Sequence, residues 1–130
     1  MISRIILKQA KKKAKRFFQK EKKKQKISKI YSASKFILRS TNFSINYDKS
    51  LKLLDNIQFF YDDINKHWAE TDGFIILLNS FKNFNNDEKN ILTNTLIHEA
   101  LHNVILRDNK HIIPEKKEHL IMEIINPQLI

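Results

Sequence analysis

The chain of 130 residues contains no cysteine, a single glycine and two prolines. The lack of cysteine excludes disulfide bonds, thiolate metal sites and cysteine nucleophiles. Because Gly73 is the only glycine, phosphate-binding loops that need several glycines, such as GxGxxG or the Walker motif, are also excluded. The longest aliphatic run, FIILL, is too short to cross a bilayer, and the first residues, MISRIIL, are too short for a secretory signal. We therefore expect one intracellular domain with a modest core and no transmembrane segment.

Positive charge is concentrated near the N-terminus. Residues 1–30 hold 13 of the 24 lysines and arginines and one acid, Glu21, so their net charge is +12. The other residues sum to −2, so the basic pI belongs to this segment rather than to the whole chain. On this ground we predict a basic N-terminal extension, 1–26, followed by a domain, 27–130.

The most basic part of this extension is KQAKKKAKRFFQKEKKKQK, residues 8–26. Its like charges repel, and it has too little apolar area to fold by itself. One interpretation is a solvated, disordered tail, and another is an anchor to nucleic acid, because about a dozen positive charges release many counterions from phosphates. A membrane-surface helix, or a nuclear or organellar targeting signal, is the third. Phe17 and Phe18 interrupt the lysines and favour stacking on bases or contact with an anionic surface.

The rest of the sequence predicts a small α+β domain. Helical spacing of apolar residues predicts a helix at about 26–39, and β-type patterns predict strands at 43–47, 56–63 and 73–79. For His67 and Trp68 the two interpretations are the lining of a cleft and a surface loop, of which the loop is favoured. Asn85 and Glu88 form a predicted capping box for a helix that ends near Leu106, and Pro114 begins a further helix that ends near Ile125.

The segment TLIHEALHNVI, residues 95–105, places three polar residues inside an apolar helical run. His98 and His102 are four residues apart, so both imidazoles project from one face and can reach one ion at the distance that zinc prefers. Glu99 points about 100° away from His98, where it can reach a water bound to that ion and accept its proton. Burying two imidazoles without a partner is costly, which favours a metal site.

Catalytic zinc usually has a third protein ligand, and the last predicted helix offers one. Glu118 lies within the apolar arc formed by Ile121, Met122 and Ile125, and a carboxylate that faces a core needs a positive partner such as zinc. His111, in the preceding loop, and His119 are the alternatives.

The segments IHEALHNV and PEKKEHLIMEI together resemble the HExxH zinc metallopeptidases, or zincins, and most closely the compact gluzincin type. The resemblance covers about residues 70–125. It implies that His98, His102 and Glu118 bind Zn²⁺, that Glu99 is the general base, and that the substrate is a peptide or protein. It also implies a zincin-like domain with a short mixed or antiparallel sheet of about three strands, packed on the HExxH helix and a following helix. GFIILLN, residues 73–79, would be an exposed edge that binds substrate by strand addition.

The sequence departs from related peptidase types. The metzincin pattern needs a glycine and a third histidine after the motif, but Arg107, Asp108 and Asn109 stand there, and His111 lacks the following glycine of SprT-like proteins. The basic segment has no counterpart in the family pattern. A second hypothesis is therefore a nucleic-acid-associated or structural protein that keeps the zincin scaffold and uses residues 8–26 as an anchor to RNA or DNA.

Overall fold

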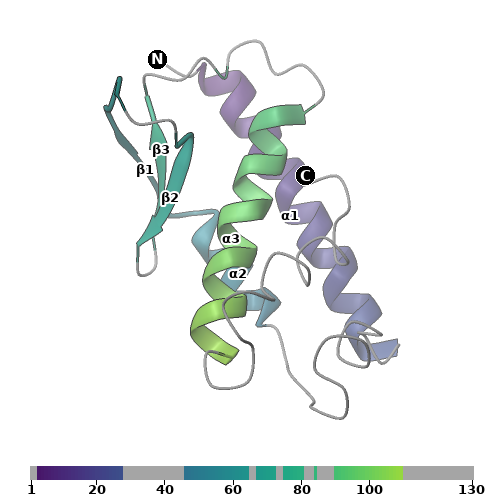
Figure 1. Cartoon of the computed structure of the whole chain (residues 1–130). Coiled ribbons are helices and arrows are strands. Elements are labelled where there is room, and N and C mark those ends of the chain that lie inside the picture. The colour runs from purple at the N-terminus through teal and green to yellow at the C-terminus, as the bar shows by residue number, and fades with distance from the viewer. Residues whose placement is uncertain are drawn as a thin grey trace.

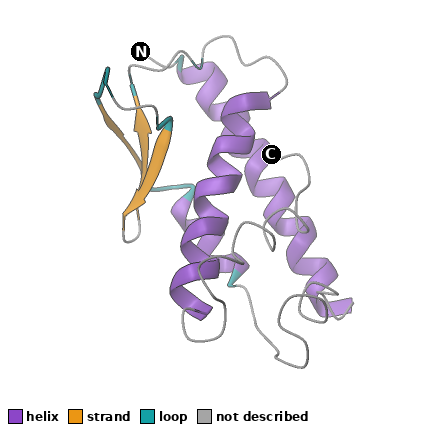
Figure 2. Cartoon of the chain, viewed as in Figure 1, coloured by secondary structure: helices purple, strands orange, loops and turns teal. Residues whose placement is uncertain are grey.

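The computed structural model describes residues 3–27, 46–64, 67–72, 75–80, 84 and 90–109. Within these ranges the chain is a small α+β domain, as predicted, with three helices and a three-stranded mixed sheet (Figures 1 and 2). The elements in chain order are α1 (Arg4–Ile27), α2 (Tyr47–Leu53), β1 (Ile57–Phe60), β2 (Ala69–Asp72), β3 (Ile75–Asn79) and α3 (Ile91–Asn109).

The sheet has the strand order β1-β3-β2. β3 pairs in parallel with β1, where Ile57 faces Ile76, and antiparallel with β2, where Thr71 faces Ile76 from the other side. The strand predicted at 56–63 is confirmed over Ile57–Phe60, as β1, and is wrong for 61–63, and the strand predicted at 73–79 is confirmed over Ile75–Asn79, as β3. The expectation that 73–79 forms an exposed edge is wrong, because β3 is the central strand. The aliphatic side chains of β3 are better shielded from water in a central strand than they would be in an edge strand.

β2 was not predicted, because its sequence, AETD, is short and polar and its neighbourhood was assigned to a surface loop. An edge strand needs apolar residues on one face only, and Ala69 supplies the buried position at 8% exposure. Trp68, just before the strand, packs edge-on against Phe84 with ring centroids 5.0 Å apart. The pairing with β3, rather than local propensity, makes this segment a strand.

The predicted strand at 43–47 is wrong for its described part. Asn46 caps α2, since its side chain accepts a hydrogen bond of 3.0 Å from the backbone N–H of Lys49. Tyr47 is the first helical residue and is buried, and Asp48 follows it in the first turn, where a negative charge stabilises a helix. This capping outweighs the apolar alternation on which the strand prediction was based.

The basic N-terminal segment forms a long helix rather than a solvated tail. Ala10, Ala14 and Phe18 of α1 are fully buried and belong to the same core as α3. Their spacing of four residues places them on one helical face, and the two alanines allow close approach to the neighbouring helix. The high net charge of the segment made this apolar stripe hard to recognise in the sequence. α1 therefore shares a core with the domain from which the sequence analysis separated it.

α3 is the central element of the molecule. The sheet lies on one side of it and α1 on the other, while α2 packs near its C-terminal half against both helices (Figure 1). The described part of α3 begins at Ile91, just after Asn90, which has a positive φ of 59° that asparagine tolerates. It also continues beyond the predicted end at Leu106, through Arg107 and Asp108 to Asn109.

Several predictions fall outside the described residues. These are most of the helix predicted at 26–39, the capping box at 85–88, the last helix at 114–125, and with them His111, Glu118 and His119. Of the helices in the described ranges, none has the length and apolar character needed to cross a membrane.

Candidate active site on helix α3

The two histidines of the HExxH segment lie together on α3. From Ile91 to Ile105 this helix is buried except along one stripe, whose members are Ile91, Asn94, Thr95, His98 and His102. The stripe follows the spacing of three and four residues that defines one face of a helix. The histidine pair thus occupies the one face of this part of α3 that is not packed into the core.

The separation of the two imidazoles fits a shared ion. Their ring centroids are 5.5 Å apart and the rings are nearly perpendicular, at 85°. Two imidazoles bound to one zinc at about 2.0–2.1 Å, with a tetrahedral angle between them, have centroids about 5 Å apart. The structure therefore brings together the two histidines that the sequence identified, at a spacing suited to one metal.

A third ligand is not found in the part of the chain that the structure describes. Those residues contain no group of three His, Asp or Glu side chains that could hold a metal ion. The three sequence candidates for this position, His111, Glu118 and His119, lie beyond Asn109 and outside the described ranges.

Glu99 is buried between α3 and the sheet, at 8% exposure. The hydroxyl of Thr71, on β2, lies 2.7 Å from Glu99 Oε2 and 3.0 Å from the backbone carbonyl oxygen of Glu99. Thr71 therefore ties the edge strand to the helix at the position of the predicted general base. The Glu99 side chain points toward the sheet and away from the histidine stripe. The residue that follows His98 on a helix is expected to point away from it by about 100°.

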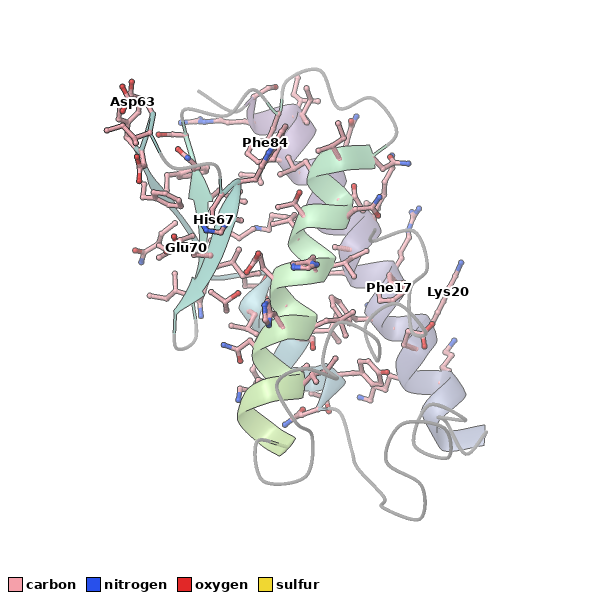
Figure 3. All side chains as sticks on the ribbon, in the orientation of Figure 1. Phe17, Lys20, Asp63, His67, Glu70 and Phe84 are labelled. Atoms are coloured by element: carbon pink, nitrogen blue, oxygen red, sulfur yellow. The ribbon has the colours of Figure 1, made fainter. Side chains whose placement is uncertain are left out.

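The surroundings of Glu99 change its acidity. Burial raises the pKa of its carboxyl group above the usual value, and this effect is larger than the lowering by the Thr71 hydroxyl and by His102. The charges of Glu70 and His67 have smaller effects: Glu70 raises the pKa and His67 lowers it. Figure 3 labels Glu70 on β2 and His67 just before that strand, across from α3. A carboxyl group with a raised pKa is a stronger base than an exposed glutamate, and so a better proton acceptor.

Asn79 holds the edge strand in place. This fully buried residue ends β3, and its side chain donates to the carbonyl oxygens of Asp62 (2.9 Å) and His67 (3.1 Å) and accepts from the N–H of Asp62 (3.2 Å). Its backbone N–H donates to the carbonyl of Trp68 at 2.8 Å. These bonds position the segment that leads into β2, and hence Thr71.

Sequence reasoning missed both Thr71 and Asn79 as residues that shape the site. The signal for Asn79 was a single amide at the end of an apolar strand, where a buried polar group needs partners. The signal for Thr71 was its alternation with Ala69, which places both on one face of a strand. Neither signal names its partner, because the partners are distant in sequence.

Comparison with known proteins gives no assignment for this chain. No family model matches it, and neither does any curated protein or solved structure. Its function therefore has to be inferred from its own residues and their geometry.

Proposed function

We propose that the chain is a zinc-dependent peptidase in which His98 and His102 bind the metal and Glu99 is the general base. One observation carries the proposal. The two imidazoles share the half-buried stripe of α3 with their ring centroids 5.5 Å apart, next to a carboxylate that is buried against β2. This arrangement combines neutral metal ligands with a desolvated base, which are the parts that metal-assisted hydrolysis requires.

Bound at this pair, zinc would supply a Lewis acid that polarises the scissile carbonyl and lowers the pKa of the attacking water. Glu99 would take a proton from the attacking water and pass it to the leaving amine. The Thr71 hydroxyl limits the rotation of the Glu99 carboxylate, and burial keeps competing water away from it. From the resemblance to gluzincins we propose Glu118 as the third ligand, with His111 and His119 as alternatives.

The substrate of this proposal is an extended peptide. Peptides commonly add as a strand to the free edge of a sheet. β3 cannot offer an edge, because it is paired on both sides, whereas β2 pairs with β3 alone among the described strands and contacts α3 through Thr71. β2 therefore takes the role that the sequence analysis gave to β3.

Metal content and hydrolysis test the assignment together. Glu99→Gln should keep zinc, measured by elemental analysis of metal-saturated protein, and lower the hydrolysis of a quenched-fluorescent peptide library by about 10²–10⁴-fold. His98→Ala and His102→Ala should lose the metal. Asn94→Ala, a change on the same stripe without a ligand atom, should alter neither quantity. Absence of zinc from saturated wild-type protein would refute the proposal.

The third ligand is tested by zinc affinity rather than by activity. If Glu118 closes the site, Glu118→Gln should weaken zinc binding far more than His111→Ala or His119→Ala, in a competition titration with a chromogenic chelator. If zinc affinity falls most in His111→Ala or in His119→Ala, that histidine is the third ligand instead of Glu118. The roles of His98, His102 and Glu99 then stay as proposed.

A further inference from the structure

The outward face of α1 carries a row of cations. Arg4, Lys8, Lys11, Lys12, Lys15 and Arg16 line one surface hollow, together with Leu7 and Gln19. Their spacing of three and four residues places them on one face of the helix. From Arg4 to Arg16 this face extends over about 18 Å, because each helical residue advances the chain by about 1.5 Å.

The buried stripe of the same helix anchors this row to the core. Ala10, Ala14 and Phe18 are fully buried in the core. Glu21, the one acid in the α1 sequence, is buried on the core side at 8% exposure, so α1 itself places no carboxylate within the cationic row. Of the six cations, Lys15 forms an ion pair within the described residues, with Asp55 at 2.5 Å. The face therefore keeps a strong positive field.

The packing of α1 argues against a lipid surface as the partner. A helix that lies on a membrane buries an apolar face in the lipid. In α1 that face is already used, since Phe18 is buried and Ile6, Leu7 and Phe17 pack against the core. Among the α1 side chains that the structure describes, Ile5 is the large apolar one that is exposed.

The same packing argues against a single-stranded nucleic acid. Proteins that bind single strands without sequence preference stack bases on exposed aromatic rings. The sequence analysis considered Phe17 and Phe18 for this role. Phe18 is instead fully buried, with Tyr47 and Phe17 as ring neighbours at centroid distances of 6.2 and 5.2 Å. Neither ring stands on the outward face with the cations.

We propose that the outward face of α1 binds the phosphate backbone of a double-stranded nucleic acid without recognising its sequence. A duplex presents about one negative charge for each 1.7 Å of its axis, so the length of this face meets more phosphates than it has cations. Lysine and arginine contacts to phosphates position a protein on a duplex but carry no sequence information. α1 lies on the side of α3 opposite the sheet (Figure 1), so duplex binding leaves the Glu99–Thr71 side of the molecule accessible.

Salt dependence of duplex binding by the full chain provides the test. Fluorescence anisotropy with labelled duplexes of about 20 base pairs, DNA and RNA, each in two unrelated sequences, measures affinity as NaCl is raised. Each phosphate contact contributes about −0.9 to the slope of log K against log salt for DNA, so five or six contacts predict a slope of about −5. The two sequences of each duplex type should bind with equal affinity.

A matched pair of double variants assigns the effect to the face. Lys8→Gln with Lys12→Gln removes two charges from the row, and Lys49→Gln with Lys52→Gln removes two charges from α2. The α1 variant should reduce the salt slope by about 2 and weaken duplex binding by about 50-fold at 0.1 M salt. The α2 variant should weaken duplex binding by less than about threefold. Glutamine is a good helix former, so both variants should keep the wild-type circular dichroism spectrum.

Three outcomes would overturn the proposal. The first is an equal loss of duplex affinity in the two double variants, which would mean that net charge alone is responsible. The second is tighter binding to a single-stranded oligonucleotide than to the duplex by tenfold or more. The third is loss of binding to vesicles with 30% phosphatidylserine in the α1 variant while its duplex affinity is unchanged, which would make a lipid surface the partner.

Discussion

Among single residues, Glu99 shows most clearly how packing changes side-chain chemistry. The Thr71 hydroxyl has one hydrogen but lies within bonding distance of two acceptors, the Glu99 carboxylate and the Glu99 backbone carbonyl. When Glu99 is ionised, the two acceptors compete for that hydrogen. Burial favours the neutral form and outweighs the Thr71 hydrogen bond, which favours the carboxylate, so the pKa of Glu99 is raised.

The raised pKa of Glu99 predicts a pH-dependent stability of the metal-free protein. A carboxyl group whose pKa is higher in the folded than in the unfolded state contributes its full stability below the unfolded pKa. That contribution is lost as the pH rises through the folded pKa. In the presence of a chelator, wild-type protein should therefore lose stability above about pH 4.5 relative to Glu99→Gln, which cannot ionise. Urea unfolding from pH 4 to 8 measures the difference, and a constant difference across this range would contradict the prediction.

At the scale of elements, the polar edge strand is held by its neighbours rather than by its own sequence. β2 joins the sheet through β3, and the buried amide of Asn79 binds the backbone of the segment that precedes it. Thr71 then links the strand to α3. Glu99 therefore lies in an interface between β2 and α3. That interface depends on Asn79, which follows Thr71 by eight residues in the sequence.

Loss of the Asn79 amide should destabilise the protein and loosen β2. Asn79→Ala leaves the N–H and carbonyl of Asp62 and the carbonyl of His67 without this partner, and we expect a loss of about 2–4 kcal/mol in the free energy of unfolding. Gln58→Ala, an exposed change on β1, should cost less than about 0.5 kcal/mol. Urea unfolding of both variants checks the contrast, and similar losses would show that the amide has no special role.

At the scale of the whole molecule, α3 has the sheet on one side and α1 on the other, and a single core connects them (Figure 1). The basic segment is consequently not an appendage of the domain but one of its layers. Its inner face stabilises the helix that carries the histidine pair, while its outer face presents the cations. One helix therefore serves both the stability of the candidate active site and the proposed binding of a duplex.

This integration predicts that a change in α1 affects the distant sheet. Phe18→Ala removes a fully buried ring and should lower the free energy of unfolding by about 3–5 kcal/mol. Trp68, the only tryptophan, lies next to β2, so its fluorescence reports unfolding at the sheet. In Phe18→Ala, the unfolding transition followed by Trp68 fluorescence should shift to the same extent as the loss of helix followed by circular dichroism. Gln19→Ala, the exposed neighbour, should shift neither, and an unshifted Trp68 transition in Phe18→Ala would mean that α1 is an independent extension.

The sequence by itself determined the elements whose patterns are local. β1, β3 and most of α3 were predictable from alternation and helical periodicity, and so was the placement of His98 and His102 on one helical face with Glu99 beside them. These features depend on residues within a few positions of one another, for which the periods of strand and helix are sufficient.

Only the tertiary structure decided the features that depend on distant partners. The polar segment AETD became a strand because β3 was available to pair with it, and β3 became central for the same reason. The lysine-rich segment became a core helix because its alanines and Phe18 are buried in the core that α1 shares with α3, and its net charge gave no sign of this burial. The pKa of Glu99 is raised by burial under the sheet and lowered, to a smaller extent, by the Thr71 hydroxyl. Such effects arise from desolvation and hydrogen bonds between residues far apart in the chain, and no local period encodes them.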